Sequence, residues 1–148
     1  MTKINYRYNT ASHREIYEHL LKTEPVFLND LRSRVNLKDY SKKMSKNSKT
    51  FEMWDDNFLV GIICAYFKKN KSYISNVSVL QEYYGQGLAK DMLRKIIKFS
   101  ENRRVSFIEL EVNIDNIPAI KLYKKFGFVY NDGLELQFIK MSLNLKDE

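Results

Sequence analysis

The protein has 148 residues, of which 44% are hydrophobic and 29% are charged. A chain of this length is typical of one domain with a single hydrophobic core, so we expect one domain over residues 1–148. Its formal net charge of +7 favours anionic partners, among them nucleic acid, acidic lipid and phosphorylated small molecules, without choosing among them.

Cysteine, histidine and hydropathy exclude several classes of protein. The single cysteine, Cys64, excludes an intramolecular disulfide bond, and it lies in an apolar run where a buried thiol is ordinary. The two histidines, His13 and His19, form no cluster with zinc-ligand spacing, so we expect no metal. No apolar stretch is long enough for a membrane helix, and the first residues lack the apolar core of a signal peptide. These patterns predict a cytoplasmic protein with no membrane partner.

Two helices are expected in the first third of the chain. Residues 12–23 place apolar side chains at helical spacing, with Ser12 as N-cap and Glu15 completing a capping box. Residues 29–45 offer a second helix, whose apolar positions include Leu31, Val35 and Met44. A polar stretch, SKNSK, follows it.

Three antiparallel strands should follow. A strand over residues 50–54, a turn at residues 55–57 and an apolar strand ending at Phe67 form a hairpin. After a second turn at residues 68–71, SYISNVSVL is rich enough in β-branched and aromatic residues for another strand. Its small polar residues, Ser75, Asn76 and Ser78, are unusual for a strand in a core.

The rest of the chain predicts a helix over residues 86–102, a strand over 106–113, and a short helix that begins after Asn116 and ends at Gly127. Residues 128–143 predict two antiparallel strands turning at residues 131–133. The fold class is therefore α+β, with a central mixed and mostly antiparallel sheet flanked by helices. It contains one parallel crossover, and in such a unit ligands bind at the C-terminal ends of the strands.

Two of the five glycines, Gly85 and Gly87, stand at the junction between that third strand and the long helix. The first N–H groups of a helix lack intrahelical partners, and its dipole places positive charge there, so the junction predicts an anion site. Lys90 and Arg94 add formal positive charge. The alternative is a structural turn with a solvated basic helix face. The sequence lacks the last glycine of a dinucleotide fingerprint and the GK[ST] of a P-loop.

The segments VSVLQEYYGQGLAKDML and IELEVNIDNIPAIKLYKKFGF resemble the two core motifs of the GNAT superfamily, the acyl-CoA-dependent N-acetyltransferases. The resemblance covers about residues 58–130 in the family's order and spacing. It implies acetyl-CoA as co-substrate. The chain departs from the family pattern at Tyr84, where glutamine or arginine is usual.

The resemblance also implies residues that bind the cofactor. The loop would hold the CoA pyrophosphate mainly through main-chain N–H groups, and the strand before it would pair with the pantetheine arm. The N–H of Val79 would polarise the thioester carbonyl, by the logic of an oxyanion hole. The residues so implied are Val77, Ser78, Val79, Tyr84, Gly85, Gln86, Gly87, Leu88, Ala89, Lys90, Asn116 and Tyr123.

Acyl transfer to an amine needs an acid for the departing thiolate and a base for the amine proton. Tyr123 occupies the family's tyrosine position in N-x-x-A-x-x-L-Y, and the resemblance implies that it is the acid. Glu111 is the candidate base because Leu110 and Val112 share the opposite face of their strand, and because the family's protein N-terminal acetyltransferases use a glutamate there. Alternatively, Glu111 is a strand-edge carboxylate paired with a lysine. A third possibility is that ordered water removes the proton, with no single residue as the base.

The acceptor amine stays open: a protein N-terminus, an amino sugar, a polyamine and an amino acid all fit. An apolar wall for it, or simply core, is expected from Phe27, Tyr40, Met44 and Trp54. Two other functions remain, a regulatory domain that binds acetyl-CoA without catalysis and a basic domain that binds nucleic acid. Association into a homodimer is also left open.

Overall fold

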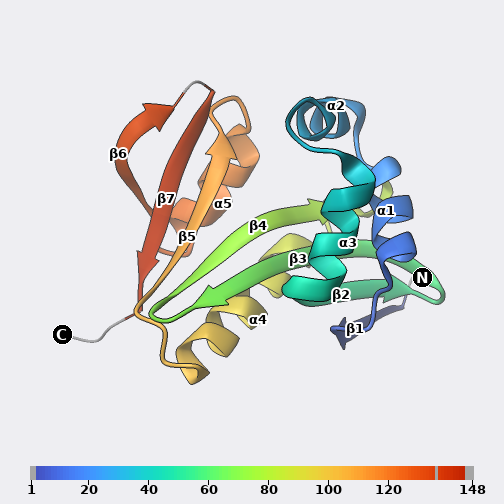
Figure 1. Ribbon diagram of the computed structural model, residues 1–148, viewed down its shortest axis with the longest axis horizontal. Coiled ribbons are helices and arrows are strands. Elements are labelled where there is room, and N and C mark those ends of the chain that lie inside the picture. The colour runs from blue at the N-terminus through green and yellow to red at the C-terminus, as the bar shows by residue number, and fades with distance from the viewer. Residues whose placement is uncertain (1–2, 136, 146–148) are drawn as a thin grey trace.

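The computed structural model describes residues 3–135 and 137–145, and a seven-stranded sheet organises them (Figure 1). The strand order is β1-β2-β3-β4-β5-β7-β6. Among the described strands, β4 and β5 are the only parallel neighbours, which confirms the predicted α+β class with a mostly antiparallel sheet. The strands are β1 (Ile4–Tyr8), β2 (Lys49–Asp55), β3 (Phe58–Lys68), β4 (Lys71–Val79), β5 (Phe107–Asn113), β6 (Val129–Glu135) and β7 (Phe138–Asn144).

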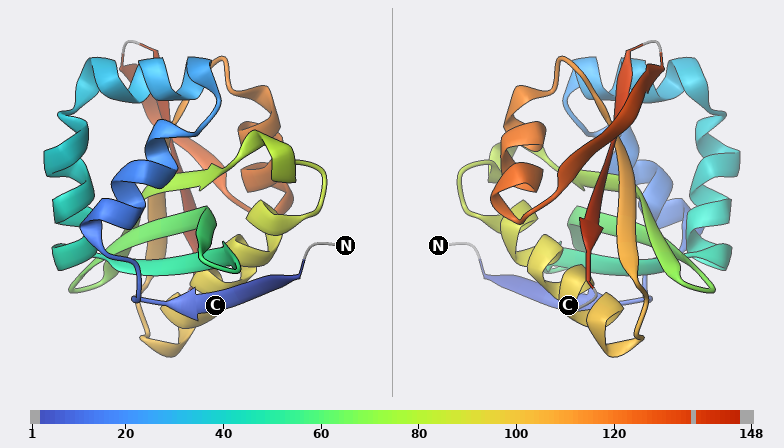
Figure 2. Two further views of the ribbon diagram at one scale, coloured as in Figure 1. Left: turned by 90° about the vertical axis from the view of Figure 1, so that its right-hand side faces the viewer. Right: turned by 90° about the vertical axis from the view of Figure 1, so that its left-hand side faces the viewer.

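Helices cover both faces of the sheet (Figure 2). One side carries α1 (His13–Leu21), α2 (Pro25–Arg34) and α3 (Leu37–Asn47), and the other carries α4 (Leu88–Asn102) and α5 (Ile117–Lys125). A short 3₁₀ turn, η1 (Gln81–Tyr83), links β4 to α4. The sheet divides the apolar interior into two clusters, one beneath each set of helices. None of the helices in the described ranges has the length and apolar character to cross a bilayer.

The helix after the glycines forms because its apolar side chains line one face. Leu88, Met92, Leu93 and Ile96 recur at helical spacing and are all buried against the sheet. Each such side chain contributes about 1.5–3 kcal/mol when fully buried. Because this signal lies entirely within the helix, the predicted helix is confirmed to within two residues.

The predicted helix over residues 29–45 is wrong, because two helices occupy this part of the chain. Asn36 lies between the two helices and is the N-cap of α3. Its backbone is extended, and its side chain accepts a hydrogen bond from the Asp39 N–H at 3.0 Å. The start of α2 also lies earlier than expected. Pro25 occupies its first turn, and the Glu24 carboxylate accepts hydrogen bonds from the N–H groups of Val26 and Phe27.

Two further differences concern strands. The edge strand β1, which pairs antiparallel with β2, was not expected, because most of its side chains are exposed and it has no apolar alternation. The final hairpin is confirmed, but the turn predicted at residues 131–133 is wrong. Strand β6 continues to Glu135, and residues 131–133 instead form an irregularity in its pairing with β7.

Strands β4 and β5 separate partway along their length. Their parallel pairing runs only from Lys71 opposite Phe107 to Ile74 opposite Leu110. At the same point the β3–β4 register shifts between Cys64 and Ala65, which marks a bulge at Ser75. Beyond it the two strands diverge, and the sheet opens as a V whose far end is covered by α2 (Figure 1).

The small polar residues of β4 have partners on the face covered by α1 and α3. The Ser78 hydroxyl contacts Nε2 of His19 at 2.8 Å, and the Ser75 hydroxyl contacts Sγ of Cys64 at 3.3 Å. The Asn76 amide contacts the Tyr40 hydroxyl at 3.4 Å. A strand with so many polar groups can therefore be buried, since helices supply most of their hydrogen-bond partners.

Candidate active site

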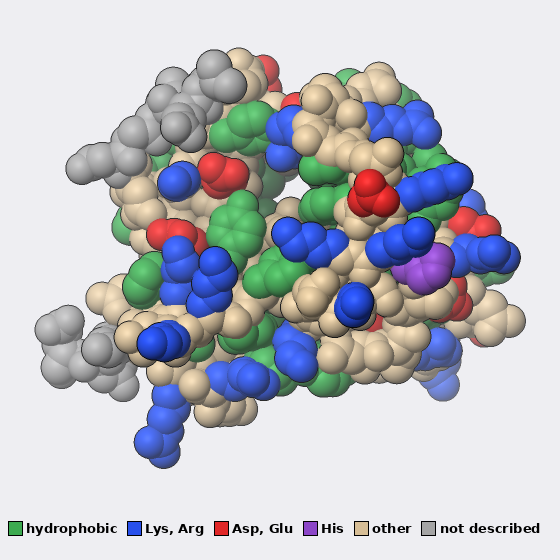
Figure 3. Space-filling model, in the orientation of Figure 1, with side chains coloured by type: hydrophobic (Ala, Val, Ile, Leu, Met, Phe, Trp, Pro, Cys, Tyr) green, Lys and Arg blue, Asp and Glu red, His purple; other side chains and the backbone are tan. Residues whose placement is uncertain are grey.

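Two cavities open where β4 and β5 separate, and they meet at four residues. The larger has a volume of about 410 Å³ and extends to the glycine junction. The smaller has a volume of about 100 Å³ and lies between β4, β5 and α2. Both are lined by Phe27, Val77, Asn116 and Tyr123. In the orientation of Figure 1, the molecule shows a notch between α2 and the β6–β7 hairpin (Figure 3).

The structure brings nearly all the expected cofactor residues to the larger cavity. Gln86 is the exception: it lies in the same turn but is exposed and does not line this cavity. Glu111 lines the smaller cavity instead. The expected residues that line the larger one are Val77, Ser78, Val79, Tyr84, Gly85, Gly87, Leu88, Ala89, Lys90, Asn116 and Tyr123.

The glycine junction has the backbone that an anion site needs. Gly85 and Gly87 have φ angles of +82° and +75°, in the left-handed region where a residue with a Cβ would be strained. Gly87 is the N-cap of α4. No side chain caps this helix start, and a Cβ added at either glycine meets no atom within 4 Å. The first N–H groups of α4 have no side-chain cap, and Gly87, Leu88 and Ala89 line the larger cavity, so a phosphate bound there could accept their hydrogen bonds.

A cluster of basic side chains adds charge beside this junction. Lys125, from the end of α5, lies close enough to Lys90 that its ammonium group lowers the pKa of Lys90. Two like charges held together repel, and an anion between them relieves the repulsion. Sequence reasoning named Lys90 and missed Lys125, which reaches the site only through the packing of α5. The open glycine cradle, this cluster and the adjoining cavity fit the pyrophosphate and pantetheine arm of a CoA molecule.

The register of β4 turns the main chain of Val77 and Val79 toward the opening. The Leu80 N–H donates to the Val60 carbonyl of β3 at 2.9 Å. Residues along an antiparallel pair alternate between bonded and non-bonded positions, so Val79, opposite Gly61, is in a non-bonded pair. Its N–H therefore points away from β3, toward the gap left by β5. Ser78 has the opposite phase, and its main chain faces β3.

A buried histidine holds the Ser78 side chain. Nδ1 of His19 lies 2.9 Å from the Leu59 carbonyl oxygen, which can only accept, so Nδ1 carries the proton. Nε2 is then an acceptor, and the Ser78 hydroxyl donates to it. Burial lowers the pKa of His19 to about 4, which keeps the imidazole neutral. Sequence reasoning considered His19 only as a metal ligand and found no role for it.

Tyr123 stands where the two cavities meet. Its side chain is 6% exposed and packs against Phe128, with ring centroids 5.7 Å apart. Burial raises the pKa of the Tyr123 hydroxyl, so it stays protonated at neutral pH. Asn116 reaches the same place from the start of α5, where its Oδ1 caps the helix by accepting from the Ala119 N–H at 3.3 Å. The position of Tyr123 suits a proton donor, and that of Asn116 suits a polar side chain beside it.

Glu111 projects from β5 on the exposed side of the strand. Burial raises the pKa of Tyr73 to about 12, with a further contribution from the Glu111 charge, and the Tyr73 hydroxyl donates to Glu111 at 3.4 Å. The lysine pair that was an alternative for Glu111 forms at its neighbour: Lys71 lies 3.1 Å from Glu109. Among the described residues no ion pair involves Glu111.

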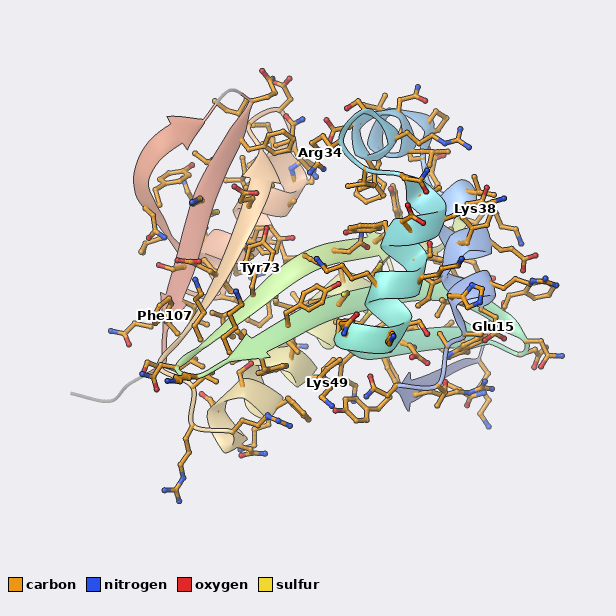
Figure 4. All side chains as sticks on the ribbon, viewed as in Figure 1. Glu15, Arg34, Lys38, Lys49, Tyr73 and Phe107 are labelled. Carbon is orange, nitrogen blue, oxygen red and sulfur yellow. The ribbon has the colours of Figure 1, made fainter. Side chains whose placement is uncertain are left out.

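Helix α2 and strand β7 provide a charged wall for the smaller cavity. Arg34 forms an ion pair with Asp30 at 3.3 Å, and its guanidinium lies 4.4 Å from the centre of the Phe138 ring. In Figure 4, Arg34 extends from α2 across the opening, and Tyr73 lies below it. These residues were not predicted, because they are far apart in sequence and only the fold brings them together.

The expected apolar wall divides between cavity and core. Phe27 lines both cavities, whereas Met44 and Trp54 are 0% and 2% exposed within the core beneath α1 and α3. Tyr40 packs against the same core, and its hydroxyl donates to the Ser75 carbonyl at 2.9 Å, beside the bulge of β4. In the described residues no three metal-binding side chains cluster as they do around an ion.

The Acetyltransferase (GNAT) family model matches residues 13–128. Part of the chain is also similar to two curated proteins. L-amino acid N-acetyltransferase AaaT of Escherichia coli is 38% identical over 64 residues, which cover 41% of this chain and 40% of that protein. Spermine/spermidine N(1)-acetyltransferase of Bacillus subtilis is 32% identical over 81 residues, which cover 52% and 53%. The chain spans about half the length of the curated relatives it matches.

Solved structures resemble the whole fold. The ribosomal-protein-S18-alanine N-acetyltransferase from Escherichia coli has a TM-score of 0.78 at 19% identity, covering 100% of this chain and 96% of that one. PaiA N-acetyltransferase from Thermoplasma acidophilum, in complex with coenzyme A, has a TM-score of 0.74 at 14% identity, covering 96% and 99%. At these identities the likeness shows the fold alone. Since the family model matches well over half of its residues, the chain belongs to the GNAT acetyltransferase family.

Proposed function

We propose that the protein transfers the acetyl group of acetyl-CoA to a primary amine by direct attack within a ternary complex. The observation that carries the proposal is the meeting of the two cavities at Tyr123. One cavity leads from the glycine junction and suits the cofactor, and the other is lined by polar side chains and suits an acceptor. A buried proton donor at their boundary lies where the reacting groups would come together.

Each step has a candidate residue. The start of α4, with Lys90 and Lys125, would hold the pyrophosphate, and the open edge of β4 would hold the pantetheine arm. The N–H of Val79 would stabilise the negative charge that develops on the thioester oxygen. Tyr123 would give its proton to the departing thiolate, and Glu111, directly or through water, would take the proton released by the amine.

The acceptor class is narrower than the chemistry alone allows. Proteins similar to this chain are named for an alanine of ribosomal protein S18, for L-amino acids and for spermine and spermidine. We therefore propose a primary amine from one of these three classes. The smaller cavity mixes the acidic Asp30 and Glu111 with Arg34, and its volume of about 100 Å³ suits a small group around the amine.

Two measurements on the intact chain test the proposal. Calorimetry should detect acetyl-CoA binding, and release of free CoA thiol should rise on addition of one of three probes: an alanine-initiated peptide, L-alanine or spermidine. Mass spectrometry of that probe should show one added acetyl group. Acetyl-CoA binding with no acetylated probe would favour the regulatory alternative, and the absence of acetyl-CoA binding would refute the assignment of the larger cavity.

A further inference from the structure

A concave surface with a volume of about 470 Å³ lies between α1 and α3, and we call it the basic groove. Its polar and aromatic lining residues are His13, Arg14, Tyr17, Glu18, Lys38 and Lys42. None of the described residues that line it also lines either cavity of the candidate active site. Lys and Arg side chains gather on this face of the molecule, over α1 and α3 (Figure 3). The basic groove is therefore a separate surface of the protein.

The basic groove carries an excess of positive charge. Arg14, Lys38 and Lys42 are cationic, and Glu18 is the one carboxylate among the described residues that line it. Helix α3 as a whole carries four lysines and one aspartate, and all four lysines are exposed. No ion pair in the described ranges involves a side chain of α1 or α3. Because like charges on one surface raise its positive potential, this face attracts anionic partners.

The lysines of α3 form a row. Lys38, Lys42 and Lys46 recur every four residues, which places them about 6 Å apart along the helix axis. Residues four apart in a helix are neighbours on the same side of it. A nucleic-acid strand carries a phosphate at every nucleotide, so its backbone can meet such a row at several points. A small anion would use only one of them.

An aromatic ring lies in the same groove. Tyr17 of α1 is half-buried, and Nζ of Lys38 lies 5.9 Å from the centre of its ring. Nucleic-acid bases stack on aromatic side chains without regard to sequence, and a cationic groove with such a ring is typical of proteins that bind single strands. In a duplex the faces of the bases are already stacked on one another. The Tyr17 ring therefore favours a single strand.

Two other anionic partners match this surface less well. A protein binds a lipid surface through exposed apolar side chains as well as through charge, and α1 and α3 expose no large apolar side chain. A groove also matches a strand better than it matches a flat bilayer. An acidic protein segment would satisfy the charge, but its carboxylates would make no use of the Tyr17 ring.

We propose that the basic groove binds a single-stranded nucleic acid. Arg14, Lys38 and Lys42 contact its phosphates, and Tyr17 stacks on a base. RNA and DNA share this phosphate and base chemistry. Because the basic groove and the larger cavity have no lining residue in common, the strand and acetyl-CoA bind at the same time.

The test measures fluorescence anisotropy of labelled RNA and DNA strands of one mixed sequence, roughly 12 nucleotides long, with the intact chain. The double variant Lys38→Gln and Lys42→Gln should weaken binding about fivefold or more at about 50 mM salt. It should also reduce the slope of log K against log salt by about 1.4, because two phosphate contacts are lost. Binding of either strand supports the proposal, and the tighter one identifies the preferred sugar.

The matched control is the double variant Lys121→Gln and Lys124→Gln. It removes the same charge from two exposed lysines of α5, where Nζ of Lys124 also lies near a tyrosine ring, 4.5 Å from the centre of Tyr130. Its Kd for the strand should stay within about twofold of the wild-type value, since these lysines lie outside the basic groove.

Tyr17→Leu separates stacking from charge. It should weaken binding about fivefold or more while leaving the salt slope unchanged, because stacking on an aromatic ring releases no counterions. The melting temperature of each variant shows whether it is folded. An unchanged Kd in folded Tyr17→Leu contradicts a stacked base.

Four results would overturn the proposal. The first is no binding of either strand by the wild type at about 50 mM salt. The second is an equal loss of affinity in the two lysine variants, which shows attraction by net charge alone. The third is displacement of the strand by coenzyme A, which places it at the glycine junction. The fourth is binding of phosphatidylserine vesicles or poly-L-glutamate as tight as that of the strand. None of these results bears on acetyl transfer, which the amine probes test separately.

Discussion

At the scale of single residues, the candidate site combines a buried tyrosine with an exposed carboxylate. Tyr123 is buried at the boundary of the two cavities, and burial favours its protonated form. Glu111 lies on the exposed side of β5 beside Tyr73. Both side chains line the smaller cavity, and we propose that they carry the two proton transfers, Tyr123 as the acid and Glu111 as the base.

Replacing Glu111 by glutamine tests the assignment of the base. If Glu111 takes the amine proton, Glu111→Gln should lower kcat by about 10²–10⁴ and remove the acidic limb of the pH profile of kcat/KM. The matched control is Glu109→Gln, which changes the neighbouring carboxylate that is paired with Lys71. An acidic limb that persists in Glu111→Gln assigns the proton transfer to ordered water.

At the scale of elements, α4 begins after two glycines and has no side-chain cap. Gly87 has a φ of +75° and a Cβ built there points into open space, so the strain of a substitution adds to the loss of room for a ligand. Gly127, which ends α5, also has a positive φ, but its Cβ would meet Leu143 at 3.2 Å, away from the larger cavity. Substitutions at Gly87 and Gly127 can therefore distinguish an effect on cofactor binding from an effect on stability.

Gly87→Ala should weaken acetyl-CoA binding about tenfold, equivalent to about 1.4 kcal/mol, because the new Cβ occupies the phosphate cradle. Gly127→Ala should lower the melting temperature through backbone strain, which costs about 1–2 kcal/mol, and leave the acetyl-CoA Kd unchanged. Calorimetry and thermal unfolding on both variants check the pair. Equal losses of affinity in both variants would contradict a specific role for the α4 start.

Elements with local signals could be predicted from the sequence, and those set by tertiary contact could not. The Ser12–Glu15 capping box and the apolar stripe of α4 are complete within their own helices, and both predictions are confirmed. Strand β1 has little apolar pattern of its own and depends on pairing with β2. Asn36 is a residue type typical of an N-cap, but apolar spacing alone does not separate the end of α2 from the start of α3, and it predicts one helix over residues 29–45.

The candidate site shows the same division. The glycines, Asn116 and Tyr123 lie in two short motifs, so their common cavity could be expected from the sequence. Arg34 over Phe138 and His19 beside Ser78 are contacts between residues far apart in the chain. Nothing in the local pattern of either partner indicates such a pair, and only the packing of α1 and α2 over the opened sheet creates it.

At the scale of the whole molecule, His19 joins α1 to the diverging end of β4. Because burial lowers its folded pKa to about 4, the unfolded chain binds a proton at His19 more readily than the folded one between about pH 6.5 and pH 4. The stability that this residue contributes is therefore complete above pH 6.5 and is lost as the pH falls toward 4.

We expect His19 to account for a loss of about 3 kcal/mol in unfolding free energy between pH 6.5 and pH 4. His19→Gln should flatten this part of the curve, although it lowers stability at neutral pH by leaving Ser78 or Leu59 without its partner. His13→Gln, which changes the exposed second histidine, is the control and should retain the wild-type slope. Urea unfolding at several pH values measures the unfolding free energy of each variant. If this free energy changed with pH in the same way in wild type and His19→Gln, protonation of His19 would not be the cause of the loss.

We infer that acetyl transfer occurs where the two cavities meet at Tyr123, so removal of the Tyr123 hydroxyl should slow the chemical step. The turnover of acetylated amine is compared for wild type and Tyr123→Phe at saturating acetyl-CoA, with the exposed Tyr130→Phe as control. We predict that kcat falls about 10²-fold or more in Tyr123→Phe, with an unchanged acetyl-CoA Kd, and stays at the wild-type value in the control. A kcat for Tyr123→Phe equal to that of the wild type would contradict the claim.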